Sequence, residues 1–497
     1  MSQTLSPYEK DRSPVFGATV PWRRAGLFMA LTFSALQMLN EIGTMMAIPL
    51  YNSMSASLHL SPGQATWALL STTIFGAATI ALLAKAGDQF GHRRLMVWCL
   101  LGITLGYVIS ALAPSFAILL VGRALTGIMA GQALCIGILN DRLTGTDKRK
   151  AIAIIAAGQA IGVFFGFALG GLLLDLGGTW RTAFWVGGAL TVVSLVAFLR
   201  WGADSDAAHK RSGHRPHLDV VGVSLLGIGM TVMCIGIAQS TSWGVWSART
   251  IGFVVIGIVV FALSLVWESR IKEPLLDVRD LLGRNLTPAY AVFLTLGVCG
   301  MLLFNLMMAW AQLPAQLVGY GLGYTPLRAA FLFLPMTVAG LLAAKTVPAL
   351  VHRFSVNHAL VGGGLAMGIA FLILRLDHHS VGIVCTAIFV YGLAYTTLLS
   401  TAISVIASEA RRGKSAGTAS LYVAMALSAS SLGGAIFAAI IAGNSAPVSV
   451  PGSSPIPMPT PDAFDIGFTI AAAAAVVAVA AGFIIRPNRH IEVTAGH

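Results

Sequence analysis

Long apolar runs separated by short polar stretches repeat along almost the whole chain. A helix needs roughly 20 apolar residues to cross a hydrocarbon layer about 30 Å thick, and each run supplies about that number. Backbone N–H and C=O groups must be paired inside a membrane, which favours helices for these runs. The pattern predicts fourteen membrane-spanning helices, at approximately 25–50, 64–85, 93–112, 115–139, 151–174, 181–201, 219–239, 250–270, 287–311, 327–348, 357–376, 380–404, 412–441 and 464–486.

The composition supports a membrane protein. Of the 497 residues, 56% are hydrophobic and only 10% are charged, and the mean hydropathy is +0.82. Such a chain is too apolar for a water-soluble domain of this length. The sequence therefore predicts an all-α integral membrane protein.

The basic residues predict its orientation. If the N-terminus is cytoplasmic and the chain crosses fourteen times, 25 of the 31 Lys and Arg fall in cytoplasmic segments. Of the other six, Arg181, Arg249, Arg328 and Arg375 fall on the outer side, and Arg123 and Lys345 lie within predicted spans. This asymmetry follows the positive-inside rule, so both termini are expected in the cytoplasm and the protein in the inner membrane. The formal net charge of +12 then reflects topology, and no nucleic-acid partner is expected.

Two hydrophilic segments divide the chain. Residues 202–218 follow the sixth run, and "SRIKEPLLDVRDLLGRN" follows the eighth. The predicted plan is a cytoplasmic tail (1–24), a six-helix bundle (25–201), a linker with two extra membrane helices (202–286), a second six-helix bundle (287–486) and a cytoplasmic tail (487–497). The polar N-terminal tail lacks the apolar core of a cleaved signal peptide, so the first span is expected to act as an uncleaved signal.

The two bundles show a weak internal echo. "VHRFSVNHALV" (351–361) aligns with "GDQFGHRRLMV" (87–97), and each stretch follows the second helix of its bundle. Many transporters are built from two such related halves. The Pro- and Ser-rich stretch 443–464 between the last two spans is expected to form an extended, mobile outer loop without chemistry.

Two charges are predicted deep within spans, where they are costly and therefore functional by default. Glu41 lies nine residues below the outer end of the first span, and Arg123 lies eight below the outer end of the fourth. At about 1.5 Å per residue both reach a similar depth, which allows them to pair. One interpretation is a structural ion pair; the other is that Glu41 carries the proton and Arg123 modulates its proton affinity.

Polar and aromatic residues within the predicted spans are candidates for lining a substrate cavity, with packing as the alternative role for each. They are Asn40, Gln132, Phe164, Phe165, Asn305, Trp310 and Gln312. Gly158, Gly162, Gly166 and Gly170 have four-residue spacing, which predicts a smooth stripe where the two bundles approach and slide. Lys345 is expected to extend to the membrane surface.

Several chemistries are excluded. The five cysteines lie within predicted spans without metal-type spacing, so no metal or other cofactor is expected. "RRGKSAG" lacks the earlier glycine of a phosphate-binding loop, and the inner loops are too short for a nucleotide-binding domain. The sequence contains no HExxH or GxSxG motif, so an enzyme is disfavoured.

Three motifs resemble those of the major facilitator superfamily, in its fourteen-helix branch of drug and proton antiporters. "AKAGDQFGHRRL" resembles the loop motif GxLADRxGRR, "RALTG" resembles RxxxG, and "GVFFGFALGG" resembles the antiporter motif of the fifth helix. The matching positions are Asp88, Gly91, Arg93 and Arg94; Arg123 and Gly127; and Gly162, Gly166, Gly170 and Gly171. Phe167 stands where the antiporter motif usually has proline.

The resemblance implies a major facilitator fold and proton-coupled export of hydrophobic or cationic drugs by alternating access. It also implies that Asp88, with Gly91, Arg93 and Arg94, forms a latch in which the carboxylate caps a helix of the other bundle, beginning near "RRGKSAG". The expected partners are a lipophilic small molecule, protons and the lipid bilayer, and the protein is expected to act as a monomer.

Three alternatives stay open at this point. The protein could export one dedicated metabolite, import its substrate with protons, or serve as a non-transporting membrane sensor on the same scaffold. The sensor alternative needs no coupling acid, so it predicts that neutralising Glu41 leaves activity unchanged.

Overall fold

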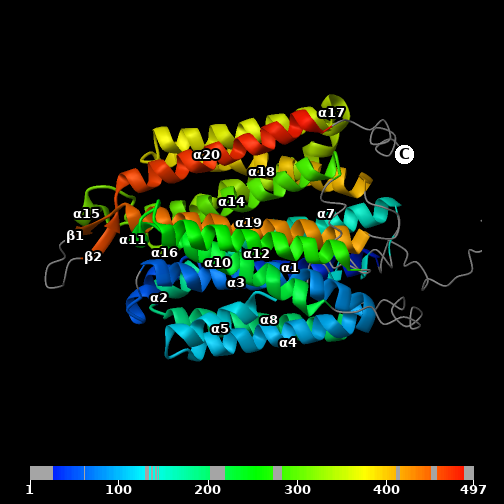
Figure 1. Cartoon of the computed structure of the whole chain (residues 1–497), viewed down its shortest axis with the longest axis horizontal. Coiled ribbons are helices and arrows are strands. Elements are labelled where there is room, and N and C mark those ends of the chain that lie inside the picture. Colours follow the sequence, from blue (N-terminus) through cyan, green and yellow to red (C-terminus); the bar gives the residue numbers. More distant parts are fainter. Residues whose placement is uncertain are drawn as a thin grey trace, which may run out of the picture.

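The computed structural model describes residues 26–60, 62–128, 134–135, 138–139, 143, 145–201, 219–271, 283–409, 415–448 and 456–485. This part of the chain is almost entirely helical, and the long helices run along the long axis of the molecule (Figure 1). A small two-stranded sheet lies at one end, which we call the hairpin end. We call the opposite end, where the last helix finishes, the far end.

In the described part of the first half, five helices of at least 19 residues coincide with predicted spans. They are α1 (Leu27–Met45), α3 (Pro62–Phe90), α4 (His92–Leu112), α7 (Gly145–Asp175) and α8 (Trp180–Trp201). The shorter helices of this half are α2 (Tyr51–Ser57) and α5 (Phe116–Thr126).

A pair of helices follows the first half. It consists of α10 (Val220–Ala238) and α12 (Ala248–Arg270), joined by the short α11 (Ser240–Trp243). Asp219 caps α10 by accepting a hydrogen bond from the Gly222 N–H at 2.9 Å, which satisfies a donor that the helix start leaves unpaired. Helix α10 contacts α3 of the first half and α19 of the second, so the pair packs against the junction of the halves.

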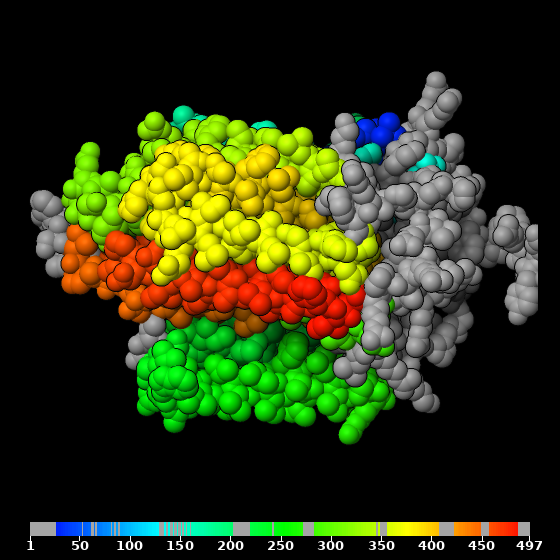
Figure 2. All heavy atoms as spheres, turned by 90° about the horizontal axis from the view of Figure 1, so that it is seen from above, coloured from blue at the N-terminus to red at the C-terminus, as the bar shows by residue number. Residues whose placement is uncertain are grey.

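The second half begins with α14 (Leu286–Gln312), α15 (Ala315–Val318), α16 (Pro326–Ala330) and the 3₁₀ turn η2 (Phe331–Phe333). It continues with α17 (Leu334–Leu376), α18 (Val381–Glu409), α19 (Ser415–Gly443), β1 (Ser445–Val448), β2 (Ile456–Pro459) and α20 (Pro461–Ile484). Figure 2 shows α20 alongside α17, with α10 and α12 forming a separate ridge on the same face.

Eleven helices in the described ranges are long and apolar enough to cross a membrane, which identifies a multi-pass membrane protein. They coincide with eleven of the fourteen predicted runs, and α1, α3 and α5 lie where the other three are predicted. The predicted span 327–348 begins in α16 and η2 and ends in α17, and the span 357–376 lies wholly in α17, which is kinked at Ser355 by non-helical backbone angles.

The stretch between the last two spans differs from the expectation of a mobile loop. Its two ends pair as an antiparallel hairpin, with Ser445 opposite Pro459 and Val448 opposite Ile456. The hydroxyl of Tyr320, between α15 and α16, donates a hydrogen bond of 2.8 Å to the Pro459 carbonyl. The hairpin is therefore fixed to the start of the second half.

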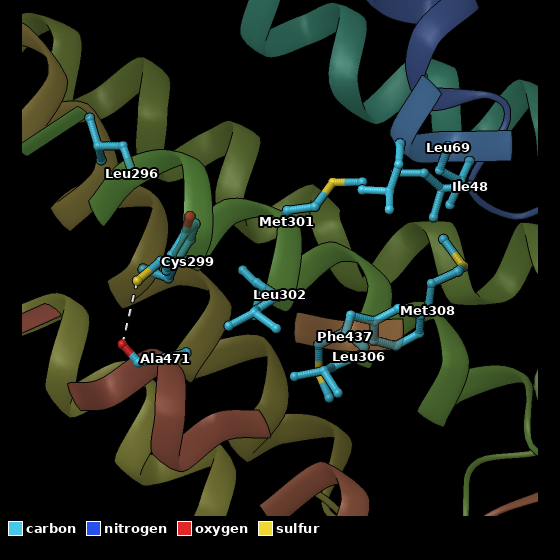
Figure 3. Packing of buried hydrophobic residues seen from close by; sticks show 14 of the residues in the cluster. Ile48, Leu69, Leu296, Cys299, Met301, Leu302, Leu306, Met308, Phe437 and Ala471 are labelled. Atoms are coloured by element: carbon cyan, nitrogen blue, oxygen red, sulfur yellow. Dashed lines mark hydrogen bonds between the residues drawn. The ribbon is translucent and has the colours of Figure 1, made fainter. Parts of the chain in front are cut away.

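Helix α14 forms the centre of the second half. Most of its side chains are buried, including Leu302, Leu306 and Met307 at 0% exposure. Figure 3 shows Cys299 donating to the Ala471 carbonyl of α20, at 3.4 Å, and Met301 pointing toward Leu69 of the first half. Helix α14 thus packs against helices of the second half on one side and reaches the first half on the opposite side.

Candidate transport site

Glu41 lies on α1 against α7. Its side chain is half-buried, and Oε1 accepts a hydrogen bond of 3.5 Å from the Gln159 amide of α7. Gly162 of α7 lies so close that a Cβ there would be 2.8 Å from Glu41 Cβ and 2.7 Å from the Met38 carbonyl. The absence of a side chain at residue 162 therefore lets α7 approach the backbone that carries Glu41.

The whole glycine stripe of α7 faces α1. A Cβ on Gly158, Gly166 or Gly170 would meet residues of α1 or of the turn that follows it, from Ser34 to Pro49. The expectation that this stripe lies where the two bundles slide is wrong, because α1 belongs to the same bundle. Only the neighbouring Gly171 adjoins the second half, where a Cβ would overlap the backbone of Leu327 in α16.

Arg123 bonds to α3 and not to its predicted partner. It is 1% exposed, and its Nε donates a hydrogen bond of 3.1 Å to the Ala68 carbonyl. The guanidinium lies 5.4 Å from the ring centre of Phe184 on α8. Thr72 of α3 in turn donates to the Arg123 carbonyl at 3.0 Å.

Close packing of α3 and α5 explains this orientation. A Cβ on Gly76 would be 2.8 Å from the Gly127 carbonyl, and one on Gly127 would overlap the Thr72 carbonyl. The glycine of the RxxxG motif thus brings α5 onto α3. In this conformation Arg123 bonds to α3 and Glu41 bonds to α7, so the predicted Glu41–Arg123 ion pair is not formed.

Tyr107 of α4 connects the two charges. Its phenol interacts electrostatically with both Arg123 and Glu41. The side chain is 3% exposed and occupies a slot lined by Gly43 of α1 and Gly187 of α8. A Cβ on Gly43 would overlap the Tyr107 hydroxyl, and one on Gly187 would be 2.7 Å from the ring.

Sequence reasoning missed Tyr107, Gln159 and Tyr395, which interact with Glu41. Gln159 could have been found, since it is a polar residue three positions before Gly162 within a predicted span. Tyr107 and Tyr395 carry no such signal, because a tyrosine in an apolar run is ordinarily a packing residue.

The residues of the loop motif form a one-residue turn. Helix α3 continues to Phe90, Gly91 has φ 93° and ψ 128°, and α4 starts at His92. Arg94 is exposed, whereas Arg93 donates a hydrogen bond of 3.0 Å to the Leu199 carbonyl near the end of α8. A cation at a helix C-terminus stabilises the last carbonyl groups.

The latch itself lies outside the described residues. This applies to the Asp88 side chain, to residues 410–414 and to the side chains at the start of α19. Gln132 and the Lys345 side chain also fall outside the described part.

Two expected cavity residues are buried elsewhere. Asn305 is 4% exposed and donates to the Met301 carbonyl of its own helix at 2.8 Å. Trp310 is 1% exposed at the hairpin end, where its ring stacks on Tyr320 with centres 6.1 Å apart. Both residues pack within the second half, and neither lies beside Glu41.

The other expected cavity residues have varied surroundings. Asn40, beside Glu41, lines a cavity of about 20 Å³ with Gln37 and Cys99, which is room for about one water molecule. Phe165 is 51% exposed, and Gln312 is half-buried at the end of α14. Phe164 makes an edge-on contact with Phe331 of η2, with ring centres 5.7 Å apart, and so reaches the second half.

The halves meet along two helix pairs. Phe167 of α7 stacks on Phe333 of η2 with ring centres 4.6 Å apart. On the other pair, Ser431 of α19 donates a hydrogen bond of 2.8 Å to the Thr73 hydroxyl of α3. Phe167 replaces the motif proline, and this stacking gives the aromatic ring its role between the halves.

Comparisons with known proteins agree with this architecture. The sequence profile of the Major Facilitator Superfamily matches residues 33–438. The fold matches the human organic anion transporter MFSD10 (TETRAN), with a TM-score of 0.63 at 15% identity, covering 94% of this chain and 100% of that one. It also matches a peptide transporter POT in complex with sulfate, with a TM-score of 0.64 at 17% identity and the same coverage. At such identities the likeness shows the fold alone.

Relatives by sequence are more informative. The chain is 28% identical over 363 residues to the uncharacterized MFS-type transporter Rv1877 of Mycobacterium tuberculosis (strain ATCC 25618 / H37Rv), matching 71% of this chain and spanning about half of that protein (50%). It is 27% identical over 393 residues to the multidrug resistance protein Stp of Mycobacterium tuberculosis (strain CDC 1551 / Oshkosh), covering 76% and 68% of the two chains. A triacylglyceride transporter of Mycobacteroides abscessus is 28% identical over 208 residues, covering 40% and 38%.

Proposed function

The chain belongs to the major facilitator superfamily and is a membrane transporter, not an enzyme; from this premise we propose that it exports lipophilic cationic or neutral compounds in exchange for protons. The fourteen-helix arrangement, with two six-helix bundles rocking about a central site, is part of this proposal. So are the inner-membrane location, the cytoplasmic far end, the monomeric state and the Asp88 latch.

The observation that carries the proposal is the position of Glu41 between elements of both halves. Its carboxylate accepts a hydrogen bond from Gln159 in the first half, and Tyr395 on α18 in the second half lies within electrostatic range of it. A rocking motion of the halves would change the Tyr395 interaction while leaving the Gln159 contact in place. Proton affinity at Glu41 would then differ between the inward and outward states, as coupling requires.

The surroundings of Glu41 suit a lipophilic cation. A carboxylate attracts a positive charge, and the Tyr395 ring lies within electrostatic range of it; the contact of Phe164 with Phe331 places two more flat apolar rings between the halves. Binding of a cation at Glu41 would compete with protonation, and this competition is the basis of exchange. The relative named multidrug resistance protein supports a drug substrate, whereas the relative named triacylglyceride transporter supports a neutral lipid as the second candidate.

Arg123 enters the proposal through Tyr107. The phenol interacts with both charges, so a shift of Arg123 relative to α3 would be felt at Glu41 without direct pairing. In this scheme Arg123 tunes the coupling, and Glu41 carries the proton.

The test is substrate-induced proton movement in proteoliposomes with an imposed pH gradient, across lipophilic cations and a triacylglyceride. Wild type should dissipate the gradient when a substrate is added, and Glu41→Gln should not. Glu268→Gln is the matched control, since Glu268 is also a buried carboxylate but lies on α12 outside the junction of the halves.

The outcomes separate the alternatives. Equal proton signals from wild type and Glu41→Gln would place coupling elsewhere. Proton movement in the same direction as the substrate would indicate a proton-coupled importer, and substrate binding without any transport would indicate a sensor. A signal with one compound alone would indicate a dedicated exporter.

A further inference from the structure

A buried histidine lies in a short connection at the hairpin end. The connection between α17 and α18 spans only four residues, Asp377 to Ser380, yet His378 is 5% exposed. Its imidazole packs edge-on against Trp310 of α14, with ring centres 4.2 Å apart, and lies 5.6 Å from Phe468 of α20. Three elements of the second half therefore converge on this ring.

The hydrogen bonds fix the tautomer of His378. Its Nδ1 lies 2.9 Å from the Leu374 carbonyl, and because a carbonyl only accepts, Nδ1 carries the hydrogen and donates. Neutral His378 then has an acceptor lone pair at Nε2. Within the described residues Nε2 is buried and has no hydrogen-bond partner.

Two side chains near His378 also carry a buried, unpaired polar atom. Trp310 Nε1 and Asp465 Oδ1 are also buried without a hydrogen-bond partner in the part of the chain that the structure describes. Asp465 follows Phe464, and the centre of the Phe464 ring lies 4.8 Å from that of Trp310. The negative charge of Asp465 favours the protonated form of His378. Buried polar groups are normally paired, so this cluster of unpaired atoms calls for a ligand.

A proton is the ligand that the cluster can accept. The unpaired atoms are closed off from solvent, and a proton needs no additional space. Adding it to His378 Nε2 creates a donor and a positive charge, and the Asp465 carboxylate supplies the opposite charge nearby. We propose that His378 is a proton-binding site at the hairpin end, separate from Glu41, with Asp465 as its counter-charge.

The charged groups around His378 set the pH at which this site responds. Burial lowers the pKa of His378, and the neighbouring His379 lowers it further. The Leu374 carbonyl, Asp465 and Asp377 act in the opposite direction but do not overcome burial. On the α14 side the contacting group is the uncharged indole of Trp310.

The sign of the effect follows from linkage. Because the pKa is lower in the folded protein than the ordinary value of about 6.5, the unfolded chain takes up this proton first as the pH falls. The packing of His378 is fully stabilising above about pH 6.5 and weakens below it. Acid on this face therefore loosens the α17–α18 connection from α14 and α20.

This inference does not depend on the transported compound. Under the proposed topology the hairpin end faces outward, so the site would report external pH. Its test needs no transport, which keeps its failure separate from a failure of the proposed exchange.

The experiment compares thermal unfolding of the purified full-length protein in detergent between about pH 8 and pH 5, a range that brackets the ordinary histidine pKa of about 6.5. Wild type should lose stability on acidification, and His378→Gln should lose much less. His379→Gln is the matched control, because His379 belongs to the same connection but is exposed; it should retain most of the wild-type acid loss, since burial is the larger cause of the lowered pKa of His378. An acid loss in His378→Gln equal to that of wild type would overturn the proposal.

A second measurement covers the case in which His378→Gln does not fold. The difference in tryptophan fluorescence between wild type and Trp310→Phe isolates the indole that contacts His378. This difference should titrate with a midpoint below about pH 6.5, and Asp465→Asn should move the midpoint to a lower pH because the counter-charge is lost. A midpoint above 6.5, or one that Asp465→Asn leaves unchanged, would contradict the assignment.

Discussion

Gly91 and Ser355 occupy matching turns in the two halves, and both have left-handed backbone angles. Gly91 has φ 93° and ψ 128°, and Ser355 has φ 72° and ψ 161°. Each follows a phenylalanine and separates the second long helical run of its half from the third. The weak echo between 87–97 and 351–361 therefore marks a shared backbone turn, although only the first half places glycine there.

We expect opposite effects from exchanging the two residue types. A residue other than glycine in this region costs on the order of 1–3 kcal/mol, so Ser355→Gly should raise the thermal unfolding temperature and Gly91→Ser should lower it. The gain at residue 355 is partly offset because the Ser355 hydroxyl bonds to His358 Nδ1 at 2.9 Å. Thermal unfolding in one detergent measures both variants. Shifts of the same sign would show that the two turns are not equivalent.

The helical architecture could be predicted from the sequence because it depends on long apolar runs. Membrane helices need about 20 such residues, and eleven of the fourteen predicted runs are spans by length and composition. The hairpin of β1 and β2 was not predictable in this way, since its strands are only four residues each and contain Pro447, Pro457 and Pro459.

The candidate site was predicted less well, for a geometric reason. Residue spacing gives the depth of Glu41 and Arg123 but not the direction of either side chain. The direction of Arg123 depends on Gly76 and Gly127, which bring α3 and α5 together so that the Ala68 carbonyl becomes its acceptor. Likewise, four-residue spacing identifies the α7 glycines as a contact stripe but does not identify α1 as the partner.

The slot around Tyr107 predicts different tolerance at two adjacent glycines. A Cβ on Gly187 would be 2.7 Å from the Tyr107 ring, whereas one on Gly188 would be 3.4 Å from Tyr107 Cβ, an ordinary contact. Gly187→Ala should cost about 1–3 kcal/mol through overpacking, and Gly188→Ala should be nearly neutral. Thermal unfolding of the two variants checks this, and comparable losses would argue against a tight slot.

The contact of α7 with Glu41 predicts a functional effect at Gly162. Gly162→Ala would force α1 and α7 apart at the Met38 carbonyl and Glu41 Cβ, so we expect lower substrate-induced proton movement as well as a loss of about 1–3 kcal/mol. Gly362→Ala on α17 is the matched control, because a Cβ there would meet no atom within 4 Å apart from its chain neighbours and the backbone of its own helix. In a helix interior that change should be neutral or stabilising by up to about 1 kcal/mol. Normal proton movement in Gly162→Ala would show that coupling tolerates displacement of α1.

The route between Arg123 and Glu41 predicts a pattern of energetic coupling. Arg123→Lys keeps a positive charge but loses the Nε donor to Ala68, and Tyr107→Phe keeps the ring in its slot but loses the hydroxyl. Because the phenol interacts with Arg123, the two changes should be non-additive in unfolding free energy by about 0.5–1.5 kcal/mol.

The double variant Arg123→Lys with Glu41→Gln tests whether these two residues form a direct ion pair. In this conformation the two side chains bond to different helices, so their effects on stability should add within about 0.5 kcal/mol. Double-mutant cycles of thermal unfolding measure both pairs under identical conditions. Strong coupling between residues 41 and 123, with weak coupling between 107 and 123, would favour a direct ion pair and remove Tyr107 from the connection.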